Sequence, residues 1–565
     1  MRFRPLHSTP MLTSLLMLGP VLAGLLGALL PAFGWLPVLG GDSLTLEPVR
    51  ALLATPGLAR SIALSLASGL LATLLAMLMV IGLLSAWSGT RLFRWMVRLI
   101  SPLLSIPHAA TALGFAFLLA PSGWIVRMIS PELTGWSRPP DWFFPHDPYG
   151  LAMIAGLTIK ELPFLLLVSL AALPQIEPRR TQNLVRSLGY GPMVGWLHAV
   201  WPRLYRQIRL PIFAVIAYAS SVVDVALILG PTNPPPLAVQ LVRWMSDPDL
   251  SMRFLASAGA ILQLLVTLAA LGIWWGGERM ASRLLGCLVQ SGLRFQRDEW
   301  ARRLAASLSI AAVLLMLLSL GGLVLWSFAG FWRFPDAVPV SLSLNTWMRQ
   351  GPMLMEPLYN AVLIGGLATV VGTVMTLAAL EAQSRMGKRS GRSAMVILYL
   401  PLIVPQVAFL FGLQLILLTV NASYALWALV FGHLIFTLPY IFLSLSDQWH
   451  ALDPRYMQMA TALGRSAWAI FWRVRLPMLL RPILTAAAVG FAVSIGQYLP
   501  TLLIGGGRWE TITTEAVALS AGGNRRLIGV YALMQMLLPF VGFFIATLIP
   551  TLFYKNRRGM TPADR

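Results

Sequence analysis

The chain has 565 residues, of which 57% are hydrophobic and only 11% are charged, and its mean hydropathy is +0.74. Soluble globular domains carry about twice this share of charged residues, so the composition excludes a soluble protein and indicates a polytopic membrane protein. The net charge of +21 would suggest nucleic-acid binding in a soluble domain. In a membrane protein this excess is expected in loops that face the cytoplasm, so we predict contact with the bilayer and none with nucleic acid.

Apolar runs of the length that a helix needs to cross the hydrocarbon predict about twelve transmembrane helices and an all-α fold. The first run follows Arg2 and Arg4 and is too long for a signal-peptide core, so we expect an uncleaved span. The runs lie at 12–34, 60–86, 99–120, 150–172, 211–231, 254–276, 304–328, 358–382, 394–419, 424–446, 479–503 and 527–553.

Basic residues gather in alternate loops, which predicts the orientation in the membrane. Arg91, Arg94 and Arg98 lie between the second and third runs, and further clusters follow the fourth, sixth, eighth, tenth and twelfth. All of them face the cytoplasm if both termini are cytoplasmic. Cys287 is the only cysteine, so an intramolecular disulfide and a cysteine-based metal site are excluded.

The second half of the chain repeats the first in the same orientation. The matching elements are Pro107 and Gly114 with Pro405 and Gly412, and Leu162-Pro163 with Leu438-Pro439. A parallel repeat of this kind indicates two homologous six-helix domains related by an axis along the membrane normal. We predict a first domain at 1–276, a charged cytoplasmic linker at 277–303 and a second domain at 304–565.

Each half carries an Arg-rich segment between two apolar runs, the first loop at 174–210 and the second loop at 447–478. In the second loop Gly464 stands where it can break a helix, and Pro477 stands where the next apolar run begins. In the first loop Gly189 and Pro202 have the same separation. Both segments therefore predict a helix, a Gly break, a short helix and then a membrane helix.

This arrangement resembles the cytoplasmic loop of ABC-importer permeases, whose pattern is Glu-Ala-Ala, three residues, Gly, nine residues and Ile-x-Leu-Pro. The second loop has Gln458, Met459 and Ala460 at the first three positions, and the first loop has Asn183, Leu184 and Val185. In the family these loops couple the permease to its ATPase. The resemblance implies coupling through Asn183, Gly189, Trp196, Pro202, Gln458, Ala460, Gly464, Phe471, Val474, Leu476 and Pro477.

Over nearly its whole length the chain resembles fused, double-length permeases of ABC importers, in the branch that includes thiamine and ferric-iron permeases. The run from Gly496 to Arg508 is similar to relatives of uncertain substrate. The resemblance implies a type I importer fold, a bacterial inner-membrane location, two copies of a cytoplasmic ATPase and a periplasmic binding protein. It also implies import by alternating access.

The chain lacks a phosphate-binding loop of its own, because Gly387-Lys388 is followed by Arg389 and position 382 is Ala. We therefore expect no enzymatic activity and no cofactor, with ATP bound by the partner subunit. Trp196 and Phe471 each stand seven residues after a loop glycine. They are candidates to anchor the loops in a groove of the partner, or alternatively to lie in the aromatic belt of the membrane interface.

The ionisable residues Lys160, Glu161 and Asp224 lie well inside apolar runs, where a charge is costly and usually functional. With Gln497 near the place of Asp224 in the second half, they are the candidate substrate pathway. We predict an ion pair between Lys160 and Asp224, which would leave Glu161 free and favour a cationic substrate. The alternative is a purely structural ion pair. We expect no metal site.

Two other function classes remain open at this level. A secondary transporter of the major-facilitator kind also has six plus six spans, but it would place its signature loops after the second and eighth. A membrane-embedded enzyme would need clustered carboxylates or histidines, and His146-Asp147 is better explained as an exposed loop. The substrate itself, whether a thiamine-like cation, ferric iron or another solute, is not identified by the sequence.

Overall fold

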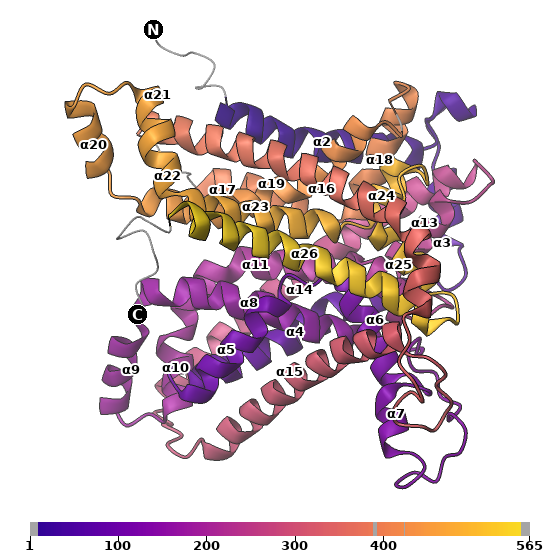
Figure 1. The fold of residues 1–565 in the computed structure, drawn as a ribbon, viewed down its shortest axis with the longest axis horizontal. Coiled ribbons are helices and arrows are strands. Elements are labelled where there is room, and N and C mark those ends of the chain that lie inside the picture. Colours follow the sequence, from indigo (N-terminus) through magenta and orange to yellow (C-terminus); the bar gives the residue numbers. More distant parts are fainter. Residues whose placement is uncertain (1–8, 388–391, 423, 555–565) are drawn as a thin grey trace.

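The computed structural model describes residues 9–387, 392–422 and 424–554, and these ranges are helical apart from loops and two isolated β-bridges (Figure 1). The first half contains α2 (Thr9–Ala32), η1 (Pro37–Leu39), α3 (Glu47–Leu53), α4 (Leu58–Trp87), α5 (Arg91–Leu103), α6 (His108–Leu119), α7 (Trp124–Ile129), α8 (Leu151–Ala172), η2 (Leu173–Ile176), α9 (Pro178–Ser187), α10 (Pro192–Ala199), α11 (Trp201–Ser221), α12 (Asp224–Leu229), α13 (Leu237–Met245) and α14 (Met252–Gln290). The second half contains α15 (Glu299–Phe328), α16 (Asn345–Arg385), α17 (Arg392–Ile403), α18 (Gln406–Thr419), α19 (Leu426–Ala451), α20 (Arg455–Ala462), α21 (Ala467–Ile470), the π-helical turn η3 (Phe471–Arg475), α22 (Leu476–Met478), α23 (Leu480–Ile495), α24 (Leu499–Gly505), α25 (Ile512–Leu519) and α26 (Arg525–Phe553). The predicted all-α fold is confirmed.

Nine helices in the described part of the chain are long and apolar enough to cross a membrane, or up to eleven if each of two bent helix pairs counts as one span. One pair joins Met395–Ile403 to Gln406–Thr419 at 88°, and the other joins Ala467–Met478 to Leu480–Ile495 at 74°. All twelve predicted runs lie on helices, but twelve continuous spans are not confirmed. The interrupted runs are 99–120, 211–231, 394–419 and 479–503.

A proline marks the break in the third apolar run of each half. Pro107 stands between α5 and α6, and Pro405 stands between α17 and α18, each directly before the first residue of the second helix. Proline has no amide hydrogen to donate and disfavours a helical conformation in the residue before it. The internal repeat read from the sequence therefore extends to the places where the helices break.

The first helix of each half packs against the other half. In Figure 1, α2 lies beside α16 and α18, whereas α15 lies beside the first-half helices α4 and α6. Glycine makes both crossings close, because a Cβ at Gly412 would lie 1.8 Å from the Gly24 carbonyl oxygen. A Cβ at Gly114 would lie 2.7 Å from the Ser319 oxygen. Close backbone approach at small residues is the usual way in which membrane helices associate.

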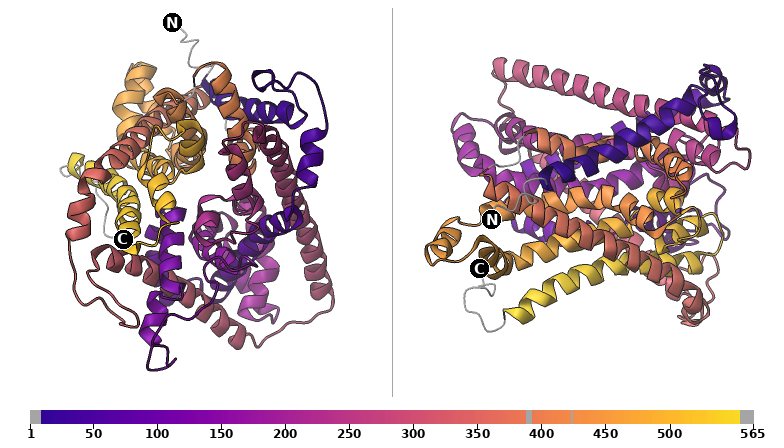
Figure 2. Two further views of the ribbon diagram at one scale, coloured as in Figure 1. Left: turned by 90° about the vertical axis from the view of Figure 1, so that its right-hand side faces the viewer. Right: turned by 90° about the horizontal axis from the view of Figure 1, so that it is seen from above.

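The first and second loops lie at the same end of the molecule. Figure 1 shows α9 and α10 of the first loop and α20 and α21 of the second loop at the left, with α7 at the opposite end. The start of α2 and the end of α26 also lie at the left, and the view from above in Figure 2 agrees. One end of the helix bundle therefore carries both Gly-containing loops.

Candidate functional site

A glycine in the left-handed conformation turns the chain in each loop. Gly189 has φ +83° between α9 and α10, and Gly464 has φ +75° between α20 and α21. This conformation is costly for any residue that carries a β-carbon. Pro202 is the second residue of α11, and Pro477 lies in α22 just before α23. The predicted order of helix, Gly break, short helix and membrane helix is confirmed in both loops.

The aromatic side chains expected to anchor a partner are buried inside the protein. Trp196 is 0% exposed and stacks on Trp201 with a centroid separation of 6.3 Å. Phe471 is 8% exposed and contacts the rings of Trp449 and Trp468. The expectation that these two rings insert into a partner is therefore wrong for this conformation, and the membrane-belt alternative fails for the same reason. Both rings support the loops from within.

The exposed apolar side chains of the two loops occupy matching positions, which the sequence analysis missed. Leu188 and Leu463 directly precede the two glycines and are 59% and 80% exposed. Leu184 and Met459, four residues earlier, are 62% and 55% exposed. Residues four apart lie on one face of a helix, so each loop presents an apolar pair to the outside. The repeated Leu-Gly dipeptide was the signal that could have identified them.

The remaining predicted coupling residues lie around these pairs. Asn183 on α9 and Gln458 on α20 are exposed, whereas Ala460 is 9% exposed and faces inward. Val474 and Leu476 are half-buried, on either side of the end of the π-helical turn. Leu184 and Met459 are the middle residues of the stretches 183–185 and 458–460, which stand at the Glu-Ala-Ala positions of the pattern. Both thus also lie on the outer surface.

The linker packs on the first loop. The Asp298 carboxylate, 6% exposed, accepts a hydrogen bond of 2.7 Å from the Met193 amide at the start of α10. The Gly191 amide donates to the Arg294 carbonyl at 3.3 Å. Around Gly464, by contrast, a β-carbon would meet no described atom within 4 Å. The two loops therefore share a backbone design but differ in what holds them.

Lys160 is buried on α8, but it does not pair with Asp224. Its ammonium group donates to the carbonyl oxygens of Leu103 and Leu104, each at 3.3 Å, and to that of Ile106. These carbonyls lie at the end of α5, where helix acceptors lack intrahelical partners. The predicted Lys160–Asp224 ion pair is therefore wrong, because the break between α5 and α6 supplies the partners of Lys160.

The two buried carboxylates instead belong to a polar cluster with a histidine and tyrosines. Glu161 is 3.2 Å from His108 Nε2, so the prediction that Glu161 lacks a partner is wrong. The His108 ring lies 4.6 Å from the Tyr218 ring, and Asp224 lies within electrostatic range of both. Two tyrosines from the second half complete the polar cluster, Tyr440 near Glu161 and Tyr498 near Asp224. Gln497 is half-buried beside Tyr498 at the break between α23 and α24.

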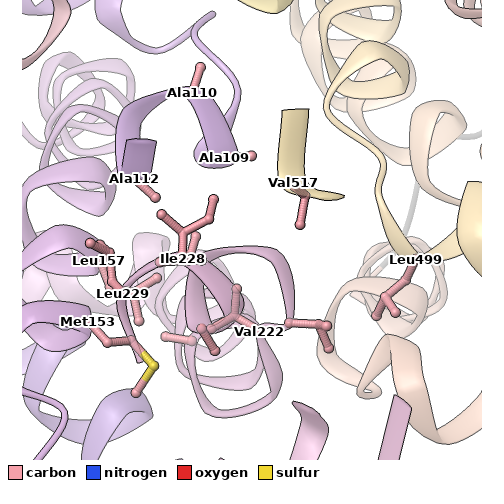
Figure 3. Close-up of a cluster of buried hydrophobic side chains, with 14 of the residues drawn as sticks. Ala109, Ala110, Ala112, Met153, Leu157, Val222, Ile228, Leu229, Leu499 and Val517 are labelled. Atoms are coloured by element: carbon pink, nitrogen blue, oxygen red, sulfur yellow. The ribbon is translucent and has the colours of Figure 1, made fainter. Parts of the chain in front are cut away.

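Apolar side chains close the contact between the two halves next to this polar cluster. Figure 3 shows Val222 and Ile228 from the first half facing Leu499 and Val517 from the second, with Ala109 nearby. All five are buried. Glu161 and Asp224 are themselves buried, whereas the side chain of His108 in the same polar cluster is 35% exposed.

Comparison with known proteins places this chain in a family. A model described as a binding-protein-dependent transport system inner membrane component matches residues 368–556. The chain is 31% identical over 526 residues to the inner membrane ABC transporter permease protein YnjC of Escherichia coli, covering 92% of this chain and 93% of that protein. It is 24% identical over 414 residues, 68% of each chain, to the probable ABC transporter permease protein y4fN of Sinorhizobium fredii.

Shorter similarity extends to permeases with named substrates. The chain is 22% identical over 183 residues to the spermidine/putrescine transport system permease protein PotC of Haemophilus influenzae, covering 32% of this chain and 70% of that protein. These matches favour an ATP-driven permease over the secondary-transporter and membrane-enzyme alternatives. With one relative matched along almost its full length, the chain belongs to the inner-membrane permease components of binding-protein-dependent ABC transport systems.

Proposed function

We propose that this permease carries two copies of a cytoplasmic ATPase, one under each loop, and receives its solute from a periplasmic binding protein. Both chain termini and both loops then face the cytoplasm. ATP is bound and hydrolysed by the partner, and the permease itself needs no cofactor. ATP-driven movement of the loops alternately opens the helices to the two sides of the membrane.

The observation that carries this proposal is the matched pair of exposed apolar side chains on two loops at one end of the molecule. Leu188 with Leu184, and Leu463 with Met459, present the same short apolar face twice. A small apolar face on a surface helix fits a groove on a soluble partner. Two equivalent faces call for two equivalent partners, which supports two ATPase copies.

The test is co-purification of the ATPase with the permease from its native membrane. Leu463→Asp and Leu188→Asp should each reduce the amount of bound ATPase at least threefold, and the double variant should abolish binding. Leu133→Asp is the matched control, because Leu133 is 83% exposed just after α7 at the opposite end. Wild-type ATPase binding by the double variant would overturn the proposal.

We further propose that the transported solute is a cation. Glu161 and Asp224 place two carboxylates in the polar cluster, and the nearby tyrosines can stabilise a cation through their ring faces. The solute released from the co-purified binding protein should therefore be a cation by mass spectrometry. Asp224→Asn should reduce its uptake at least tenfold with normal abundance, whereas Asp249→Asn in an exposed loop should not. An anionic solute would contradict this assignment.

A further inference from the structure

A buried ion pair fastens the second loop to α16. Arg475, the last residue of the π-helical turn, donates through Nη1 to Oε2 of Glu381, which is 6% exposed. The other oxygen of Glu381 accepts a 2.7 Å bond from Nε of Arg385, on the same helix. Hydrogen bonds between two charged groups are among the strongest in proteins. The loop and α16 are thus joined at one defined point.

One aromatic side chain, that of Trp449, joins this ion pair to α19. The Arg475 guanidinium lies 5.2 Å from the ring centroid of Trp449 on α19, an arrangement that attracts a cation to the ring face. The Trp449 indole donates a 2.9 Å hydrogen bond to Ser384 Oγ on α16, and its ring also contacts Phe471. The second loop, α16 and α19 therefore meet around one guanidinium group.

The first loop has no charged residue at the position that corresponds to Arg475. By the positions of Gly189 and Gly464, Arg475 corresponds to Val200, which is 1% exposed and carries no charge. The first loop is instead held by the linker, through Asp298 and Arg294. The ion pair is therefore a feature of the second loop, and the general fold of the loops does not require it.

The helix at the other side of the ion pair reaches the opposite end of the molecule. α16 has 41 residues, which corresponds to roughly 60 Å at the helical rise. In the half of α16 away from the ion pair, the Asn360 amide donates a 3.0 Å hydrogen bond to the Glu510 carbonyl in the loop after α24. A displacement of the second loop that is carried by α16 would therefore reach the end of the molecule distant from the loops.

We propose that the Arg475–Glu381 ion pair is the connection through which the second loop moves α16 when the ATPase changes conformation. Arg475 and Glu381 are positioning residues, since neither lies in the polar cluster of Glu161 and Asp224. This inference rests on the proposed docking of an ATPase to the loops. It assigns the transmission of ATP-driven movement in this half to one ion pair.

The test separates transmission from stability by comparing single and double variants. Glu381→Gln leaves Arg475 without its carboxylate, and Arg475→Met leaves Glu381 with Arg385 alone, so both should lower the abundance of the permease. The double variant Arg475→Met/Glu381→Gln removes both charges and should recover abundance and ATPase co-purification to near wild type. Its response to ATP should nevertheless stay at least threefold below that of wild type.

The response is measured with N-ethylmaleimide on the purified complex that contains the permease and its ATPase. In a Cys287→Ser background, Glu510→Cys places a thiol in the exposed loop that contacts α16, and its labelling rate is compared with and without ATP and vanadate. Arg209→Met/Glu278→Gln is the matched control, because this ion pair of 2.7 Å joins α11 to α14 away from the second loop. The control should respond to ATP as wild type does.

The possible outcomes are distinct. A double variant with normal ATPase binding and a wild-type ATP response overturns the inference, because the ion pair is then only structural. A wild-type permease that binds no ATPase overturns the proposed function, and the inference falls with it. A double variant that binds ATPase normally but no longer changes its labelling with ATP supports the connection.

Discussion

The ammonium group of Lys160 lies against three backbone carbonyl oxygens at the break between α5 and α6. The last carbonyls of a helix have no intrahelical donor, and the helix dipole makes this end partly negative. A lysine there satisfies several acceptors at once and needs no carboxylate partner. Asp224 instead lies within electrostatic range of His108 and Tyr218.

Lys160→Met should therefore destabilise the protein by removing the donor of the Leu104 and Ile106 carbonyls, whereas the Leu103 carbonyl keeps a 3.4 Å hydrogen bond from the Ile106 amide. We expect the free energy of unfolding to fall by about 2 kcal/mol, the usual cost of a buried group without a hydrogen-bond partner. The measurement is denaturation in detergent followed by tryptophan fluorescence. Adding Asp224→Asn should give the sum of the two single effects, because the residues do not contact each other. A double variant more stable than Lys160→Met alone would restore the ion-pair hypothesis.

The sequence could predict that these positions matter, but not how they pair. Lys160, Glu161 and Asp224 stand out because charges within apolar runs are rare. Their neighbours His108 and Tyr218 lie on α6 and α11, and the carbonyls bonded by Lys160 become available only where Pro107 breaks the third run. Hydropathy contains no information about which helix faces meet, so pairing by depth alone gave the wrong partner.

At the level of an element, the two loops also show that the sequence predicts local backbone structure better than tertiary packing. The glycine turns at Gly189 and Gly464 were predicted correctly because a left-handed residue is a local demand of the backbone. The burial of Trp196 and Phe471 was not, because it depends on Trp201, Trp449 and Trp468 packing around them. The aromatic residues at equivalent positions of the two loops therefore indicated equivalent packing sites inside the protein.

Asp298→Ala should release the linker from the first loop. The Asp298 carboxylate holds the amide of Met193, so its loss leaves the start of α10 without this acceptor and frees the segment that contains Arg294 and Arg297. We expect trypsin to cleave after these arginines at least threefold faster, as measured by gel electrophoresis of the purified protein. Glu299→Ala is the matched control, because Glu299 is an exposed neighbour. Equal cleavage of both variants would show that Asp298 does not hold the linker.

At the scale of the whole molecule, the exchange of first helices could not be predicted from the apolar runs. The sequence repeat matched Gly114 with Gly412, and the structure shows that each receives the first helix of the other half. Hydropathy locates the spans along the chain but does not show which helices pack against each other. The packing joins the halves at two crossings, α2 with α18 and α15 with α6, so each half contributes to the support of the other.

The orientation of the whole molecule can be tested with its only cysteine. Cys287 is exposed near the end of α14, which has 39 residues and is therefore far longer than the roughly 20 that cross a membrane. Its last turns also carry Arg279 and Arg283, as expected for a cytoplasmic extension. In intact cells Cys287 should react with a membrane-permeant maleimide and not with an impermeant one.

The control places a thiol at the opposite end of the bundle. Leu133→Cys in a Cys287→Ser background should react with both reagents, because Leu133 is 83% exposed at the end of the molecule that carries α7. Labelling of Cys287 by the impermeant reagent, with protection of position 133, would invert the protein in the membrane. Both loops would then face away from ATP, and since the arginine distribution and the proposed ATPase docking depend on the same orientation, one labelling experiment tests them together.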